Sequence, residues 1–156
     1  MSQIQRHTCI KFRPKTADDT FYIRLFKGQG CYASIGRDPD FPEGLVSLGE
    51  GCYYAGTVVH ELMHTIGYYH EHNRHDRDDY LRIYPDNINP EDLEQFDIND
   101  RRNERIFTSF DYNSVMLYGP RAFSKDQHSI TMEPKLAGFY MIEVHEKPGL
   151  TKLDAE

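Results

Sequence analysis

Apolar and polar positions alternate differently in the two parts of the chain. In the first third, short runs of aromatic and β-branched residues between polar or glycine-containing turns predict strands. The predicted strands are Cys9–Arg13, Phe21–Phe26, Cys31–Ile35 and Leu45–Leu48. The spacing between apolar residues then changes to that of a helix, which predicts a helix at Thr57–Gly67. Residues 1–8 are polar and too few to form a helix that is stable alone.

The pattern weakens after residue 70. Pro90–Phe96 predicts a short helix, because proline suits the first helical turn and acidic side chains suit a helix N-terminus. From about Arg101 onward the chain is loop-rich. Asn73–Tyr84 is dense in charge and leaves two interpretations open: a solvated surface segment, which is the usual case, or a buried cluster of ion pairs behind His70.

Strands followed by one helix and an irregular remainder predict an α+β fold. With 156 residues the chain is long enough for one domain with a hydrophobic core. We expect residues 1–70 to form an upper lobe that contains the sheet and the helix, and residues 71–156 to form a loop-rich lower lobe. A ligand site is expected in the cleft between the two lobes.

Composition narrows the function classes. A formal net charge of −7 argues against a nucleic-acid partner, because a phosphate backbone requires a basic surface. No apolar run is long enough for a membrane span, and the N-terminal residues contain no apolar segment typical of a signal peptide. The sequence therefore favours a globular protein that acts on something other than nucleic acid.

Residues 60–70 carry the candidate chemistry. On a helix, His60 and His64 project from the same face, so both imidazoles can bind one zinc ion. Gly67 can adopt a left-handed conformation that ends the helix, after which His70 can return as a third ligand. Glu61 is free to act on a water molecule. Three protein ligands and one water are typical of a catalytic zinc site.

A purely structural interpretation competes with this one. In it, Leu62, Met63 and Ile66 form the apolar face of a core helix, and the histidines only pack. The combined spacing of three histidines, one glutamate and one glycine is much rarer than a helix face of this kind. We therefore favour the metal site.

The three cysteines indicate a disulfide. Cys31 and Cys52 flank a turn-rich segment of the kind that a disulfide closes, and no C-x-x-C spacing supports a cysteine-rich zinc site. Cys9 has no obvious partner. A third cysteine in a chain of extracellular character indicates a missing partner, an intermolecular bond or a free thiol.

Several motifs together resemble the astacin family of metzincin metallopeptidases. The segment His60–His70 is followed by Glu71, Arg74, an Asp-Arg-Asp run and Tyr80, as in that family. Ser114–Tyr118 resembles the family's Met-turn, Ser47–Cys52 the segment before the active-site helix, and Thr8–Phe12 a strand near the first cysteine. The resemblance runs from Thr8 to Tyr118, and more faintly to Asp154. It implies a metzincin-like fold.

The resemblance also implies roles for individual residues. His60, His64 and His70 would bind one Zn²⁺ per chain. Glu61 would polarise the attacking water and pass its proton to the leaving amine, and Tyr118 would stabilise the tetrahedral intermediate.

Structural roles follow in the same way. Met116 would form a hydrophobic floor under the histidines, and Cys31 and Cys52 would pair. Glu71 matches the acid that receives the buried mature amino terminus in the family. Leu117 replaces the family's usual histidine, which is not a ligand, so the chemistry should survive.

Both ends of the family's domain are expected to be missing. The first strand and most of the first long helix have no counterpart before Thr8, and Glu156 falls where the last helix would begin. That helix carries the cysteine that normally pairs with the one at Cys9. Glu71 would then need another partner or remain solvated.

These observations predict a secreted zinc-dependent endopeptidase that acts on protein or peptide substrates. The alternative is a catalytically inactive, zinc-binding relic or a binding module, because part of the family's fold is expected to be absent. Arg121, Lys125 and Lys135 follow the Met-turn and are candidates to line a pocket for acidic substrate side chains.

Overall fold

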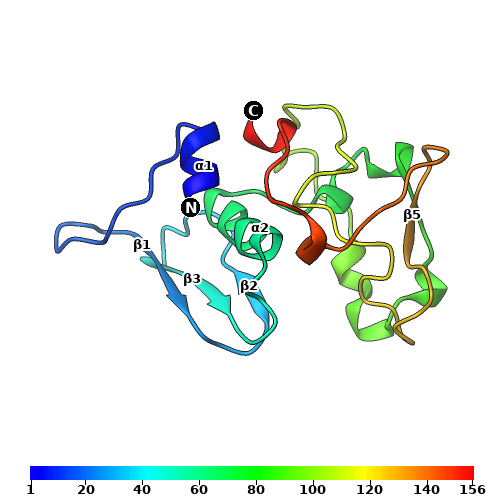
Figure 1. Ribbon diagram of the computed structural model, residues 1–156, viewed down its shortest axis with the longest axis horizontal. Coiled ribbons are helices and arrows are strands. Elements are labelled where there is room, and N and C mark those ends of the chain that lie inside the picture. The colour runs from blue at the N-terminus through cyan, green and yellow to red at the C-terminus, as the bar shows by residue number, and fades with distance from the viewer.

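The computed structural model describes residues 1–156 and shows two lobes beside each other (Figure 1). The N-terminal lobe contains a three-stranded sheet and the long helix α2. The sheet consists of β1 (Tyr22–Phe26), β2 (Cys31–Ala33) and β3 (Glu43–Leu48). Its order is β1-β3-β2, with β1 parallel and β2 antiparallel to β3. The predicted α+β class is confirmed, and the sheet is mixed.

Helix α2 (Ala55–Ile66) packs over this sheet. It begins two residues before the predicted helix and ends where expected, because Gly67 adopts a left-handed φ of 108°. The apolar face of α2 is buried through Val59, Leu62 and Met63. This packing fixes the direction of the histidines on the same helix.

The predicted strand at Cys9–Arg13 is wrong, because this segment pairs with no other strand. Its backbone bonds to side chains instead: Phe12 N–H donates to Gln5 Oε1 at 2.7 Å. The first eight residues were predicted to be too few for a helix that is stable alone. Six of them form helix α1 (Ser2–His7). Ile4 is fully buried against α2, so tertiary packing provides the stability that a six-residue helix lacks.

The C-terminal lobe has little regular structure. Strands β4 (Leu81–Ile83) and β5 (Met132–Pro134) form an antiparallel pair that the sequence pattern did not predict, because each has only three residues. The predicted helix at Pro90–Phe96 exists as a 3₁₀ helix. The other 3₁₀ segments are Glu71–Asn73, Arg77–Asp79, Pro85–Asn87, Val144–Glu146 and Leu153–Ala155.

Two hydrophobic cores meet at the segment Ser114–Tyr118. Val115 and Met116 belong to the N-terminal core with α2, whereas Leu117 belongs to the C-terminal core. The C-terminal core consists of Leu81, Ile88, Phe96, Phe110, Leu117, Met132 and Met141. This turn therefore connects the lobes directly under the histidines. None of the helices has the length and apolar character needed to cross a membrane.

Candidate metal centre

Three histidines converge at the C-terminal end of α2. His60 and His64 project from the helix, and His70 follows the turn at Gly67. One nitrogen from each ring lies within 4.8 Å of the other two. The Nε2 atom of His64 lies 3.1 Å from that of His60 and 3.0 Å from that of His70. The structure thus brings together the three residues predicted as metal ligands.

Hydrogen bonds set the tautomer of two rings. His60 Nδ1–H donates to the Val115 carbonyl at 2.8 Å, and His64 Nδ1–H donates to the Tyr68 carbonyl at 2.7 Å. The Nε2 lone pairs of these rings therefore face each other. Such lone pairs repel at 3 Å unless a cation lies between them. A tetrahedral zinc ion with Zn–N bonds of about 2.0–2.1 Å separates its ligand nitrogens by about 3.3 Å, so the three histidines fit zinc.

Burial keeps the imidazoles neutral. It lowers the pKa of His60 to about 3, and it also lowers the pKa of His64 and His70. Neutral imidazole is the form that binds a metal ion. The site is therefore ready to bind metal across the physiological pH range.

Glu61 lies beside this cluster and is only 5% exposed. Its Oε2 atom has no hydrogen-bond partner in the protein, and burial raises the pKa of its carboxyl group to about 7. Glu61 lines a pocket of about 590 Å³ together with His60 and Tyr118. A buried, unpaired carboxyl group at the wall of a pocket is suited to exchange a proton with a molecule that enters it.

Tyr118 packs on the histidine rings. Its ring stacks on His60 at a centroid distance of 5.5 Å and lies 4.4 Å from that of His70. Burial raises the pKa of Tyr118 above its ordinary value, so its hydroxyl stays protonated. Met116, at 1% exposure, lies in the core with α2, and its role as a floor under the histidines stays a prediction.

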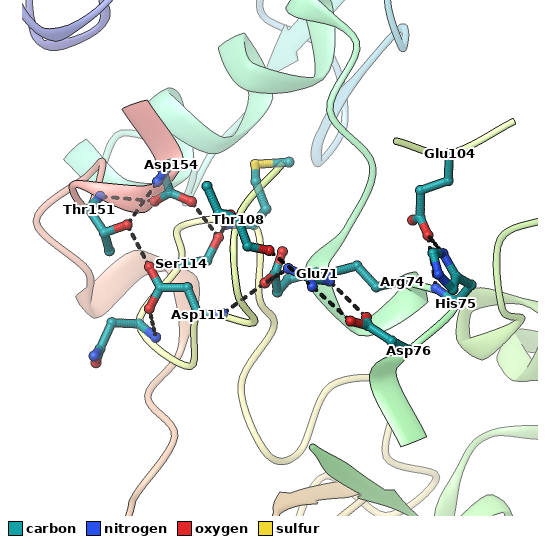
Figure 2. A network of polar contacts seen from close by, with 12 residues as sticks. Glu71, Arg74, His75, Asp76, Glu104, Thr108, Asp111, Ser114, Thr151 and Asp154 are labelled. Carbon is teal, nitrogen blue, oxygen red and sulfur yellow. Dashed lines mark hydrogen bonds and ion pairs between the residues drawn. The ribbon is translucent and has the colours of Figure 1, made fainter. Parts of the chain in front are cut away.

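Glu71 has found a partner within the chain. Arg74 Nη1 donates to Glu71 Oε1 at 2.9 Å, and Asp111 N–H donates to the same oxygen at 2.9 Å (Figure 2). Burial still raises the pKa of Glu71 to about 7. Arg74 also bonds both carboxylate oxygens of Asp76.

The solvated interpretation of Asn73–Tyr84 is therefore wrong in its central part. Arg74 and Arg77 are 7% and 8% exposed. Arg77 Nη1 donates to the backbone carbonyls of His72 and Phe96. The centre of this segment is therefore a buried polar cluster behind His70. Backbone carbonyls in these loops have no strand partner, and the guanidinium groups of Arg74 and Arg77 donate hydrogen bonds to such carbonyls.

The disulfide between Cys31 and Cys52 is present, and Cys9 is exposed as a free thiol. The basic residues expected to line the pocket lie elsewhere: Arg121, Lys125 and Lys135 bond the carbonyls of His128, Asp86 and Asp78. The pocket is lined instead by Glu143 and His145, among others. No spacing in the sequence indicated these two residues.

Sequence reasoning also missed three buried polar residues around the metal centre. His72 is fully buried and stacks on Tyr118. Lys147 and Asp154 are 3% and 7% exposed and contact the turn beneath His60. Nothing in the local sequence distinguishes them from surface residues.

Comparisons with known proteins agree with this geometry. The chain is 41% identical over 155 residues to "Astacin-like metalloprotease toxin 1" of Loxosceles intermedia, covering 99% of this chain and 58% of the toxin. It is 37% identical to "Zinc metalloproteinase nas-13" of Caenorhabditis elegans, over 99% of this chain and 33% of that protein. The chain thus spans less than two thirds of these relatives.

Among solved structures, high choriolytic enzyme 1, a hatching enzyme zinc-protease from Oryzias latipes, superposes with a TM-score of 0.84 at 31% identity. The match covers 97% of this chain and 73% of the hatching enzyme. The family model described as Astacin, a peptidase family, matches residues 1–156, including the seven residues before the predicted resemblance. The chain belongs to the astacin family of peptidases.

Proposed function

We propose that this chain is the catalytic part of a secreted zinc-dependent endopeptidase. The observation that carries the proposal is the convergence of three imidazole nitrogens next to the buried, unpaired carboxyl group of Glu61. His60, His64 and His70 would hold one zinc ion. When bound, zinc supplies Lewis acidity, which polarises a peptide carbonyl and lowers the pKa of water toward about 7.

Glu61 is the proposed general base and acid. Its buried carboxyl group has no hydrogen-bond partner at Oε2 and lines the pocket, so it would accept a proton from the attacking water and later donate it to the leaving amine. Tyr118 keeps its proton and lines the same pocket. Its hydroxyl would donate a hydrogen bond to the oxygen on which negative charge develops.

The edge of the sheet suggests how a substrate binds. Strand β2 is an outer strand in the order β1-β3-β2, and Cys31 at its start lines the pocket. An extended peptide can add to such an edge through main-chain hydrogen bonds. Protein or peptide substrates would therefore lie along β2 and across the metal centre.

An extracellular location is supported by the disulfide Cys31–Cys52, because such bonds persist in oxidising environments. The relatives named as toxins and as a hatching enzyme are consistent with it. The alternative function is a zinc-binding protein without activity. We favour the enzyme because Glu61 has no structural partner that would explain its burial.

The test combines metal content with proteolysis. Bound zinc and casein cleavage are measured for the wild type, for Glu61→Gln and for Glu94→Gln, an exposed control. We expect about one zinc per chain, chelator-sensitive cleavage in the wild type and the control, and a loss of about 10²–10⁴-fold in Glu61→Gln. Zinc binding without cleavage in the wild type would leave the inactive alternative.

A further inference from the structure

A directed chain of hydrogen bonds leads from His60 to Asp154. His60 Nδ1–H donates to the carbonyl of Val115 at 2.8 Å. The N–H of the same peptide group, which belongs to Met116, donates to Ser114 Oγ at 3.0 Å. Ser114 Oγ–H donates to Asp154 Oδ1 at 2.5 Å, as Figure 2 shows. Every donor along this path points away from the imidazole and toward the carboxylate.

The path runs through the interior of the protein. His60 and Ser114 are each 2% exposed and Asp154 is 7% exposed, while the peptide between Val115 and Met116 is enclosed by the N-terminal core. Hydrogen bonds in such surroundings are electrostatically stronger than in water, and bonds in series polarise one another. The charge of Asp154 can therefore influence His60 without touching it.

Asp154 itself is held in place by backbone groups. Its second carboxylate oxygen, Oδ2, accepts the N–H groups of Val115 at 3.0 Å and Thr151 at 2.9 Å. Thr151 Oγ1 accepts the N–H of Asp154 at 3.0 Å. None of the ion pairs in the structure includes Asp154, so no cation competes by direct contact with the Ser114 hydroxyl for its negative charge.

The other helix histidine lacks such a connection. His64 Nδ1–H donates to the Tyr68 carbonyl, and the N–H of the same peptide group, that of Tyr69, makes no backbone or side-chain hydrogen bond within the chain. The two rings on α2 therefore differ: His60 is connected to a carboxylate and His64 to a simple carbonyl.

We propose that Asp154 and Ser114 are positioning residues for the metal centre. Histidine ligands commonly donate their second N–H to a carboxylate, which fixes the ring and raises its basicity. Here the carboxylate acts at a distance, through the Ser114 hydroxyl and one peptide group. It holds the His60 ring with Nε2 toward the other imidazoles and strengthens it as a ligand. This inference rests on the proposed function for the identity of the ligands, but not on catalytic activity.

Two variants break the path at different points. Ser114→Ala removes the hydroxyl and leaves the bonds from Asp154 Oδ2 to the backbone in place. Asp154→Asn removes the negative charge at nearly constant volume. Ser114→Thr keeps the hydroxyl and is the conservative rescue. Ser47→Ala is the matched control, because it also removes a buried serine hydroxyl, one that donates to the Gly30 carbonyl and lies outside the path.

The measurements are zinc affinity by competition with a chromophoric chelator and the ¹H chemical shift of His60 Hδ1 in the zinc-free protein. We expect Ser114→Ala and Asp154→Asn to weaken zinc binding about 10-fold and to move Hδ1 upfield, because the hydrogen bond from His60 weakens. Ser114→Thr should stay near the wild type. Ser47→Ala should lower the melting temperature and leave the Hδ1 shift unchanged.

The proposal is overturned if both breaking variants keep wild-type zinc affinity and Hδ1 shift. It is also overturned if Ser47→Ala changes both as strongly, because the effect would then come from general loss of stability. Asp154→Asn and Ser114→Thr alone decide the question if Ser114→Ala does not fold. A wild type that binds zinc with this pattern and cleaves nothing would support the path and refute the proposed enzyme.

Discussion

The two lobes are held together by different means. In the N-terminal lobe, α2 buries an apolar face over a three-stranded sheet, and backbone groups bond to one another in regular ladders. In the C-terminal lobe, strands and 3₁₀ segments are short, and buried charges bond to the backbone. The candidate metal centre combines two histidines of α2 with His70, and the turn at Val115 holds the His60 ring. The comparison shows that an irregular lobe can hold a site firmly when charged side chains replace ladder hydrogen bonds.

Arg77 and Lys147 illustrate the replacement. Arg77 Nη1 bonds the carbonyls of His72 and Phe96, and Lys147 Nζ bonds those of Ser114 and Leu117. One cation thus satisfies two carbonyls that no strand partner reaches. Because a buried carbonyl without a donor costs free energy, the C-terminal lobe should depend on these cations as the N-terminal lobe depends on apolar packing.

The largest loss of stability is expected for Arg77→Met. The variant leaves two buried carbonyls without a donor, so we expect the free energy of unfolding to fall by about 4 kcal/mol. Denaturant unfolding followed by circular dichroism measures it. Arg102→Met is the control, since Arg102 pairs with Asp100 at the surface, and its midpoint should match the wild type. If Arg77→Met and Arg102→Met unfolded at the same denaturant concentration, the C-terminal lobe would not depend on its buried cations.

The disulfide provides the corresponding test in the N-terminal lobe. Cys31 and Cys52 are 21 residues apart in sequence, so replacing both with serine should lower the free energy of unfolding by about 3 kcal/mol through the entropy of the unfolded chain. Cys9→Ser is the control, because Cys9 is free. A double variant as stable as this control would show that the sheet does not need the bond.

How much of this could be read from the sequence depends on the lobe. Residues 57–67 and the three histidines were predictable because helical spacing and ligand spacing are local. The family resemblance added Met116 and Tyr118. Strands β4 and β5 were not predictable, since their pairing joins residues about fifty positions apart and is only three residues long.

The burial of charged residues could not be predicted from the sequence either. Asp154 and Lys147 resemble surface residues in sequence, and only tertiary contact brings them beneath His60. The strand predicted at Cys9–Arg13 was wrong for the opposite reason. The segment has the composition of a strand, but its backbone N–H groups donate to the side chains of Thr8 and Gln5, which are close in sequence. Local pattern predicts an element well only where long-range partners agree with it.

A smaller effect should appear in the pH dependence of stability. Burial lowers the pKa of Lys147 to about 8, from 10.5 in the unfolded chain. Between these values the unfolded chain binds a proton that the folded protein does not, so stability should rise with pH. We expect the wild type to gain about 2 kcal/mol relative to Lys147→Met between pH 8 and pH 10. A constant difference between the two proteins would contradict the lowered pKa.

The smallest effect is expected for the preference among peptide substrates in the pocket between the lobes. Glu143 lines the pocket beside Glu61, and no lysine or arginine does. Glu143→Lys should therefore raise cleavage of peptides with an acidic residue next to the cleaved bond, relative to basic ones, by about 10-fold. Peptide pairs that differ at this one residue measure the ratio. Glu94→Lys, which reverses a charge at an exposed residue outside the pocket, should leave the ratio unchanged.

The turn Ser114–Leu117 also bears on the order in which the site assembles during folding. His60 meets Val115 across 55 positions of the chain, and Ser114 meets Asp154 across 40. Contacts of such long range form late, and a chain made on the ribosome folds from its N-terminus. Helix α2 can therefore exist long before the residues that orient His60 have been synthesised. A nascent or partly folded chain would therefore lack the contacts that orient the His60 ring.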